Sequence, residues 1–275
     1  MSSEGKMSRP LTEMEYAECF NAFKKVSTEW MAIEGWLSDD FIPSLAGRKS
    51  AKILSIGSGT GDFDLTLMRM LLGKIPTLSY IALDPNEMHN KIFLNQYRES
   101  GLSLSSFQII AKPFCEDLPG GGFDLVHLTH CLYYIPDRKM AIRKAYEMLN
   151  PGGILLIFHQ TPLGINEIQR IYLKRVKGDD KELFSSYDIQ LIMKELGMRF
   201  NFNVLISDID VTDCIAGTDT GRRILSFFLE SNLEELDQTQ YDEIIRTLKE
   251  ICQYKDGRYL LFHPSGIFWI RKDPI

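Results

Sequence analysis

Residues 52–64 read KILSIGSGTGDFD, and this stretch decides the fold. It opens with a short apolar run containing β-branched Ile, typical of an interior strand of a parallel sheet. A turn with three glycines, Gly57, Gly59 and Gly61, then surrounds Ser58 and precedes a helix. Because glycine has no side chain, a ligand can lie directly against the main chain of this turn. The G-x-G-x-G spacing differs from the G-x-G-x-x-G of dinucleotide-binding turns, so it predicts S-adenosylmethionine as the cofactor rather than NAD. A plain tight turn is the alternative.

A second predicted strand, residues 78–83, ends at an acidic residue. Asp84 follows the glycine turn by roughly 25 residues, which is where α/β nucleotide sites place an acid for the ribose hydroxyls. We therefore expect Asp84, with the adjacent Pro85, to bind the cofactor. The alternative is an ordinary Asp-Pro-Asn turn that begins at Asp84 and includes Asn86.

Two further predicted strands lead to polar and aromatic side chains. Residues 106–110 precede three candidates for covering the adenine: Phe114, Cys115 and Glu116. Residues 123–128 resemble the central strand of such sheets, and ligands bind at the carboxyl ends of parallel strands. The side chains expected there, facing the cofactor and the substrate, are Thr129, His130, Tyr133 and Tyr134.

Strands and helices alternate through the middle of the chain, which predicts a doubly wound α/β sheet. We expect a helical N-terminal cap over residues 1–46, starting at Thr12, and a cofactor-binding core over 47–163. Residues 164–200 and 210–256 are predicted to be lid or substrate-binding elements, with the charged run 174–182 as a mobile segment. Residues 201–209 and 257–275 are expected to complete the core sheet, with 258–262 and 267–271 as a hairpin-like pair.

Composition predicts a soluble enzyme with one principal core in its 275 residues. The formal charge of −6 argues against a nucleic-acid partner, because phosphate binding needs a basic surface. The five cysteines are scattered and odd in number, which predicts reduced thiols and no metal site. No membrane-length apolar run or signal peptide is evident, so we expect a cytoplasmic monomer that acts on a small molecule.

Five segments carry a resemblance that runs almost from end to end. They are YAECFNAFKKVSTE (16–29), KILSIGSGTGDFDL (52–65), CLYYIPD (131–137), ISDIDVTDC (206–214) and DGRYLLFHPSGIFWI (256–270). In this set and order the chain resembles the class I S-adenosylmethionine-dependent methyltransferases and, within them, the histamine N-methyltransferases. The resemblance implies a Rossmann-like sheet, mostly parallel with an antiparallel C-terminal strand, and S-adenosylmethionine as cofactor.

The resemblance also implies roles for residues at matching positions. For the cofactor these are Gly57, Asp84, His89, Phe114 and Thr129. For the substrate they are Tyr16, Phe20, Glu29, Tyr133 and Tyr134. We also expect Phe228 at the substrate site. An aromatic chamber with one carboxylate suits a protonated amine, since the acid pairs the charge and ring faces attract it. Alternatives remain: Glu29 as a first-turn acid of a helix capped by Ser27, and the tyrosine pair as ordinary packing.

Several positions depart from the family pattern. His130 stands where the family has Gln, Pro264 stands where it has Asn, and Ile165 and Gln169 stand where it has two tryptophans. We therefore expect His130, and also His263, to replace the lost hydrogen bonds. His130, Glu29 and Tyr133 are the predicted catalytic residues, with His130 able to accept a proton near neutral pH. The alternatives are that His130 only caps its strand and that Cys131 is a buried packing thiol.

The predicted function is S-adenosylmethionine-dependent N-methylation of a small amine or imidazole compound. Related enzymes on the same fold would methylate an imidazole dipeptide, an amino acid or an oxygen nucleophile. A non-enzymatic alternative is a protein that binds the cofactor without turnover, and a nicotinamide oxidoreductase is a further option that the glycine spacing disfavours.

Overall fold

The computed structural model describes residues 7–45, 47–115, 120–178 and 183–273. The chain divides into two compact units, and it passes between them several times. The sheet unit comprises Ile33–His159, Ser186–Val204 and the chain from Gly266 onward. The helical unit comprises the chain up to Ala32 together with Gln160–Ser185 and Leu205–Ser265. In the described part of the chain, no helix is both long and apolar enough to cross a membrane.

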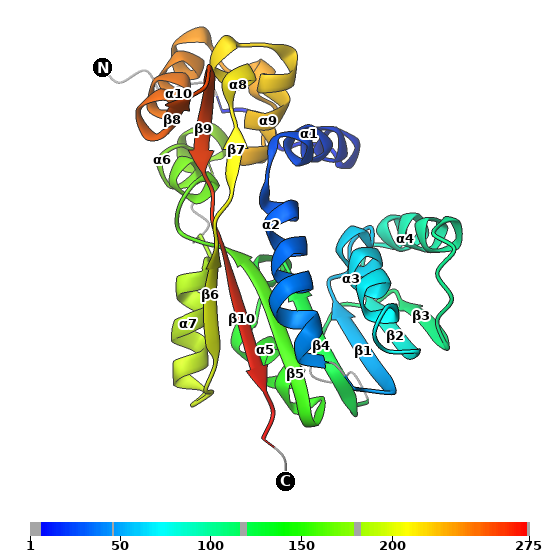
Figure 1. Cartoon of the computed structure of the whole chain (residues 1–275). Coiled ribbons are helices and arrows are strands. Elements are labelled where there is room, and N and C mark those ends of the chain that lie inside the picture. Colours follow the sequence, from blue (N-terminus) through cyan, green and yellow to red (C-terminus); the bar gives the residue numbers. More distant parts are fainter. Residues whose placement is uncertain (1–6, 46, 116–119, 179–182, 274–275) are drawn as a thin grey trace. The chain divides into compact units, whose positions relative to one another are not determined.

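A seven-stranded sheet forms the core of the sheet unit, in the order β3-β2-β1-β4-β5-β10-β6 (Figure 1). It is mostly parallel with one antiparallel strand, which confirms the predicted Rossmann-like class I fold. The strands are β1 (Ser50–Ile56), β2 (Thr77–Leu83), β3 (Ser106–Ile110), β4 (Phe123–Thr129), β5 (Leu149–Gln160), β6 (Asn201–Leu205) and β10 (Ser265–Arg271). Apolar residues bury both faces of β1 and β4, as a central parallel strand requires.

Helices alternate with the strands in the middle of the chain, as predicted. This unit contains α3 (Asp62–Leu72), α4 (Glu87–Glu99), α5 (Arg138–Glu147) and α7 (Ser186–Glu195), together with the short helices η1 (Leu37–Phe41), η2 (Ile42–Leu45) and η3 (Leu132–Tyr134). Side-chain caps set their starts. Asn86 accepts hydrogen bonds from the first turn of α4, and Asp137 accepts one from the N–H of Met140 in α5.

Strand register aligns the carboxyl ends of the central strands. Ile56 of β1 pairs with Leu83 of β2 on one side and with Leu128 of β4 on the other. At the same edge, Leu83 pairs with Ile110 of β3. The segments that follow β1, β2 and β4 therefore start side by side, at the edge where open α/β sheets bind ligands.

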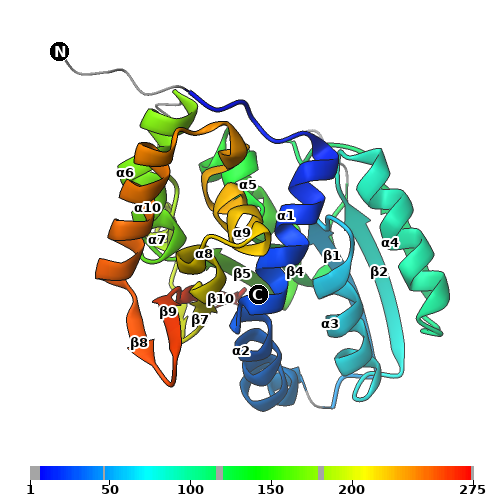
Figure 2. The same ribbon diagram turned by 90° about the horizontal axis from the view of Figure 1, so that it is seen from above.

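The helical unit surrounds a small three-stranded sheet in the order β7-β9-β8. Its strands are β7 (Asp208–Asp210), β8 (Gln253–Lys255) and β9 (Arg258–Phe262). Its helices are α1 (Glu13–Val26), the start of α2 (Glu29–Trp36), α6 (Ile165–Lys177), α8 (Thr212–Ala216), α9 (Asp219–Leu229), η4 (Leu233–Glu235) and α10 (Gln238–Ile251). Figure 2 shows α1 beside α9, and α6 beside α10. Apolar stripes on α6, α9 and α10 form the core of this unit.

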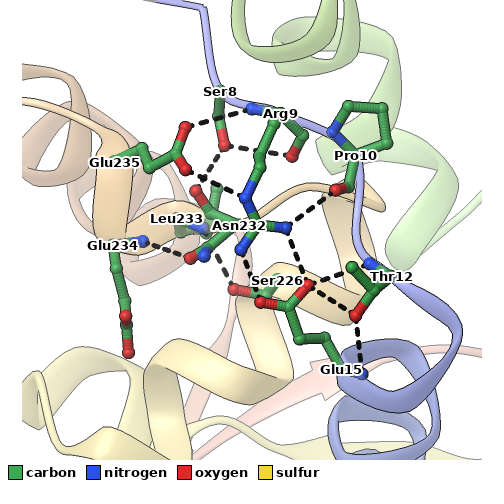
Figure 3. Close-up of polar contacts among 10 residues, drawn as sticks. All are labelled: Ser8, Arg9, Pro10, Thr12, Glu15, Ser226, Asn232, Leu233, Glu234 and Glu235. Carbon is green, nitrogen blue, oxygen red and sulfur yellow. Dashed lines mark hydrogen bonds and ion pairs between the residues drawn. The ribbon is translucent and has the colours of Figure 1, made fainter.

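The N-terminal segment is tied to two helices of the helical unit (Figure 3). The Arg9 guanidinium forms two hydrogen bonds with the Glu15 carboxylate of α1, at 2.7 and 2.6 Å. Its Nε lies 3.1 Å from Glu235 of η4. The N–H of Asn232 donates to the Arg9 carbonyl at 3.0 Å, and the Ser8 hydroxyl donates to the Asn232 carbonyl. These contacts link the start of α1 to η4.

Three expectations about the chain's course differ from the structure. The helical region from Thr12 is broken, because Ser27 is extended and forms a bridge with Ile209. The single strand expected over 201–209 is two strands, β6 and β7, in different sheets. The expected hairpin of 258–262 and 267–271 is likewise β9 and β10 in different sheets. Alternating strand residues look the same whichever sheet they join, so the sequence pattern could not assign them.

These assignments shift the expected domain limits. Residues 208–209 and 258–262 were expected to complete the core sheet, yet both belong to the small sheet. Helix α7, expected as lid material, belongs to the sheet unit. Of the charged run 174–182, α6 covers the part up to Lys177, and residues 179–182 lie outside the described residues.

Candidate active site

The candidate cofactor residues all lie in the sheet unit. They are Gly57, Ser58, Gly59, Gly61, Asp84, Pro85, His89, Phe114, Cys115 and Thr129. The candidate substrate residues are divided. The sheet unit carries His130, Tyr133 and Tyr134, whereas the helical unit carries Tyr16, Phe20, Glu29, Ile165, Gln169, Phe228, His263 and Pro264. The candidate substrate residues are therefore divided between the two units.

The glycine turn is held against the end of β2. The N–H groups of Gly57 and Ser58 donate to the Leu83 carbonyl, at 2.8 and 3.2 Å. All three glycines have positive φ, which glycine adopts without a side-chain penalty. A Cβ on Gly57 would lie 2.4 Å from the Cβ of Cys131, whereas one on Gly59 would meet no atom within 4 Å. Gly57 thus serves packing, and Gly59 borders open space.

Asp84 faces this turn from the end of β2. Its carboxylate accepts the Gly59 N–H at 2.9 Å and the Asn86 N–H at 2.8 Å. The second bond is the Asx turn proposed as the alternative, so Asp84 both begins a turn and contacts the glycine turn. Each carboxylate oxygen retains a lone pair, which can accept a ribose hydroxyl. The imidazole of His89 lies 3.9 Å from the same carboxylate.

The polar groups around the turn fit an adenosyl ligand. The Ser58 hydroxyl is buried, and among the described residues it has no hydrogen-bond partner. The side-chain amide oxygen of Asn90 on α4 is also buried and has no hydrogen-bond partner among the described residues. The amide nitrogen of the same side chain donates to the Asp84 carbonyl at 2.9 Å. Buried acceptors of this kind suit a ligand that brings hydroxyl and amine donors. Gly59, Ser58 and Asp84 are the residues best placed to hold it.

The side chains expected at the adenine differ in exposure. Phe114 is buried, and Cys115 is exposed. Pro85 is also exposed, and Glu116 lies outside the described residues.

His130 directly follows β4 and has an unusual backbone. Its φ is 49°, in the left-handed region that non-glycine residues seldom adopt and that often marks functional sites. Its N–H donates to the Phe158 carbonyl at 3.0 Å, so the proposed strand cap is present at the main chain. Cys131 is the buried packing thiol of the alternative, with its Sγ 3.1 Å from the Ile56 carbonyl.

Aromatic rings gather beside His130, and one of them was not predicted. The His130 ring centroid lies 6.2 Å from that of His159, a fully buried residue near the end of β5. Tyr133 lies 5.3 Å from the same ring and 4.4 Å from Tyr134. Tyr134 is 61% exposed. His159 ends a run of apolar strand residues. A titratable residue at the end of such a run was the signal that could have revealed it.

A second unpredicted group lies buried in the same unit. The Tyr80 hydroxyl is 2.8 Å from the Asp64 carboxylate and 2.7 Å from Nε2 of His127. Burial raises the pKa of Asp64 to about 6 and lowers the pKa of His127 to about 3. Nδ1 of His127 is 3.5 Å from the Thr129 hydroxyl. The network therefore links α3 and two strands to a candidate cofactor residue.

The helical unit contains a cluster of aromatic rings on α1 and α9. Tyr16 and Phe20 are stacked at 6.3 Å, and Phe227 lies 5.7 and 5.4 Å from them. Phe227 also stacks on Phe23 at 4.7 Å. The predicted substrate residue Phe228 is fully buried in the hydrophobic core, whereas the neighbouring Phe227 is partly exposed. With two adjacent phenylalanines on a helix, the sequence could not decide which one faces the core.

Glu29 begins α2 and is 6% exposed. Its N–H donates to the Ser27 hydroxyl at 3.2 Å, which confirms the predicted cap. Its carboxylate accepts a hydrogen bond from the hydroxyl of Ser265, a residue that sequence reasoning missed. The first-turn alternative is therefore present, and Glu29 also has a buried carboxylate with a side-chain donor, which a first-turn acid does not need.

Three other predicted substrate residues are engaged by main chain. Nδ1 of His263 accepts the Ile165 N–H at 3.4 Å, so a neutral His263 carries its proton on Nε2. The Gln169 amide nitrogen donates to the Phe228 carbonyl at 2.9 Å. The Pro264 carbonyl accepts a main-chain N–H at 3.3 Å. His263 therefore presents a donor at Nε2, while the Gln169 amide is used in packing.

Within the described ranges, no group of three or more His, Cys, Asp or Glu side chains is arranged to hold a metal ion.

Comparison with known proteins identifies the family. A family model described as a methyltransferase domain matches residues 32–205. The chain is 25% identical over 274 residues to carnosine N-methyltransferase 2 of Gallus gallus, covering 92% of this chain and 85% of that protein. It is also 25% identical to histamine N-methyltransferase of Rattus norvegicus, with coverages of 89% and 90%.

Solved structures share the fold. A putative sarcosine dimethylglycine methyltransferase from Galdieria sulphuraria has a TM-score of 0.56 at 14% identity, covering 96% of this chain and all of that one. The family match spans more than half of the chain and includes the glycine turn, Asp84 and the end of β4. The chain therefore belongs to the methyltransferase-domain family and is an S-adenosylmethionine-dependent methyltransferase.

Proposed function

We propose that the protein methylates a nitrogen atom of a small cationic amine or imidazole compound. The observation that carries the proposal is the buried carboxylate of Glu29, which lies in the same unit as the aromatic cluster of Tyr16, Phe20 and Phe227. A carboxylate pairs the positive charge, and each well-placed ring adds about 0.5 to 2 kcal/mol. The names of the histamine and carnosine N-methyltransferases that the chain resembles support the same substrate class.

The chemistry asks mainly for positioning. S-adenosylmethionine supplies an electrophilic methyl group on a positively charged sulfur. The nucleophilic nitrogen must be unprotonated and in line with that methyl group, so binding and orientation account for most of the rate enhancement. In this proposal the cofactor is held by Ser58 and Gly59 of the glycine turn and by Asp84. Glu29 orients the substrate.

His130 and Tyr133 are proposed to act at the methyl-accepting nitrogen. Both follow β4, the strand whose carboxyl end faces the ligand edge of the sheet. An imidazole can attack directly, whereas a primary ammonium must first lose a proton. His130 is the proposed acceptor of that proton, because imidazole is the side chain that most often serves as a general base. His159, packed against both His130 and Tyr133, is proposed to hold the two rings in place.

The test compares Glu29→Gln with the wild type on a panel of histamine, carnosine, other biogenic amines and amino acids. Glu29→Gln keeps the size of the side chain and removes its charge. We expect KM for the preferred cationic substrate to rise about tenfold or more, because hydrogen bonds to charged groups are the strong ones. Glu18→Gln removes an exposed carboxylate of α1 and serves as the control, with unchanged kinetics.

Affinity for S-adenosylhomocysteine should be the same in all three proteins, which shows that the cofactor site is intact. An unchanged KM in Glu29→Gln would refute the role of Glu29. Turnover of neutral oxygen nucleophiles alone would refute the substrate class.

A further inference from the structure

We propose that Ser265 is a positioning residue that sets the orientation of the Glu29 carboxylate for the cationic substrate. The inference rests on the proposed function, in which Glu29 binds that cation. It adds a residue from β10, nearly at the other end of the chain, whose hydroxyl selects one orientation of the acid.

The geometry of Ser265 is that of a fixed donor. Its side chain is fully buried, and its hydroxyl donates to Oε1 of Glu29. The preceding residues are pinned by main chain: the His263 N–H donates to the Ser207 carbonyl at 2.9 Å, and the Ser207 hydroxyl donates to the His263 carbonyl. The Thr161 N–H donates to the carbonyl of residue 264 at 3.3 Å. The hydroxyl therefore sits on backbone that has little freedom to move.

The backbone of Glu29 is anchored as well. The Thr28 N–H donates to the Asp208 carbonyl at 3.0 Å, and the Thr28 hydroxyl accepts the Asp208 N–H at 2.9 Å. Glu29 itself is held by the Ser27 cap at 3.2 Å. With both backbones fixed inside one unit, the remaining freedom is the rotation of the Glu29 side chain, which a hydrogen bond from Ser265 restricts.

One serine hydroxyl uses a small part of the hydrogen-bond capacity of a carboxylate. A serine hydroxyl has one proton, and Ser265 gives it to Glu29. A carboxylate has about four lone-pair sites, so this bond occupies only part of its capacity. An ammonium or imidazolium N–H can use another site on a carboxylate that is already oriented. Preorganisation of this kind improves binding because less side-chain freedom is lost when the ligand arrives.

The first experiment compares two substitutions of Ser265 whose side chains have the same shape. Ser265→Thr keeps the hydroxyl, and Ser265→Val replaces it with a methyl group of similar size. We expect KM for the preferred cationic amine to rise about tenfold in Ser265→Val and to stay within about twofold of wild type in Ser265→Thr. The change should appear in KM with kcat nearly unchanged. Calorimetric titration of histamine into the protein loaded with S-adenosylhomocysteine gives the same comparison without turnover.

The control is Ser231→Ala. Ser231 is fully buried in the same unit, and within the described part of the chain its hydroxyl has no hydrogen-bond partner. We expect this change to leave KM unaltered. Melting temperatures and S-adenosylhomocysteine affinity are measured for every protein, so that a folding defect is recognised.

A double-mutant cycle separates this inference from the proposed function. In the Glu29→Gln background, Ser265→Val should add less than about twofold to KM, because the carboxylate that Ser265 orients is gone. Independent effects that multiply would overturn the inference, as would equal KM values for Ser265→Thr and Ser265→Val. If Glu29→Gln alone leaves KM unchanged, the proposed function fails, whatever the serine variants do. A raised KM in Glu29→Gln with no effect of Ser265→Val refutes only the role of Ser265.

Discussion

Individual residues of the glycine turn have separate tasks, although the motif presents them as equivalents. Gly57 lies against Cys131, where a Cβ would be 2.4 Å from another carbon. A Cβ on Gly61 would likewise lie 2.1 Å from a ring carbon of Phe93 on α4. Only Gly59 of the three has open space where a side chain would be. Two glycines therefore permit close packing of the protein, and the middle one borders open space, where we propose that the cofactor lies.

This division predicts different consequences for two alanine substitutions. Gly57→Ala combines a positive φ with a steric clash and should lower the free energy of unfolding by about 3 kcal/mol. Gly59→Ala carries only the backbone penalty, about 1 to 2 kcal/mol, but its methyl group occupies the open space beside the turn. Thermal unfolding with and without S-adenosylmethionine measures both effects. We expect the melting-temperature increase caused by S-adenosylmethionine to fall more in Gly59→Ala than in Gly57→Ala, although Gly59→Ala loses less stability without the cofactor.

Equal cofactor-induced shifts in Gly59→Ala and the wild type would contradict the placement of the cofactor against Gly59. An unaltered melting temperature in Gly57→Ala would contradict the packing of that glycine on Cys131.

Helix α3 and the strands β2 and β4 are joined by the buried network of Asp64, Tyr80 and His127. The pKa of His127 falls to about 3 from an ordinary 6.5, so the unfolded chain binds more protons than the folded one between these values. Stability contributed by neutral His127 is therefore complete above pH 6.5 and is lost as pH falls. Asp64 opposes this, since its pKa rises to about 6 from 3.8, and its contribution is lost as pH rises through that window.

His127→Gln isolates the histidine contribution. Each pKa unit corresponds to 1.36 kcal/mol, so lowering the pH from 6.5 to 5 should destabilise the wild type by about 2 kcal/mol more than the substituted protein. Urea denaturation at several pH values measures the difference. Parallel stability curves for the two proteins would mean that His127 titrates normally in the folded state.

Elements of the sheet unit followed from sequence more closely than those of the helical unit. The four strands from β1 to β4 are indicated by apolar runs between glycine, proline and capping residues, and the structure confirms them. Residues 202–209 and 258–271 also have strand character, but each contains a change of sheet. Which sheet a strand joins depends on contacts far apart in the chain, which local patterns do not contain. Ser265 escaped notice for the same reason, since its partner Glu29 is 236 residues away.

On the scale of the whole molecule, the chain combines a methyltransferase sheet unit with a helical unit assembled from three separate stretches. The family match, residues 32–205, contains most of the sheet unit and one stretch of the helical unit. The residues proposed to choose the substrate belong largely to the helical unit. The cofactor motif is contiguous, so it could be predicted from sequence. The aromatic cluster and the Glu29–Ser265 pair come from α1, α9, α2 and β10, and only folding brings such residues together.

The most direct test of the account is acceptor-dependent formation of S-adenosylhomocysteine by the wild-type protein, with the mass of the product determined. With S-adenosylmethionine and a small cationic amine or imidazole compound, we predict release of S-adenosylhomocysteine and a product that is heavier by one N-linked methyl group. Binding of S-adenosylmethionine with no acceptor-dependent release across the panel, or methylation confined to oxygen, would contradict it.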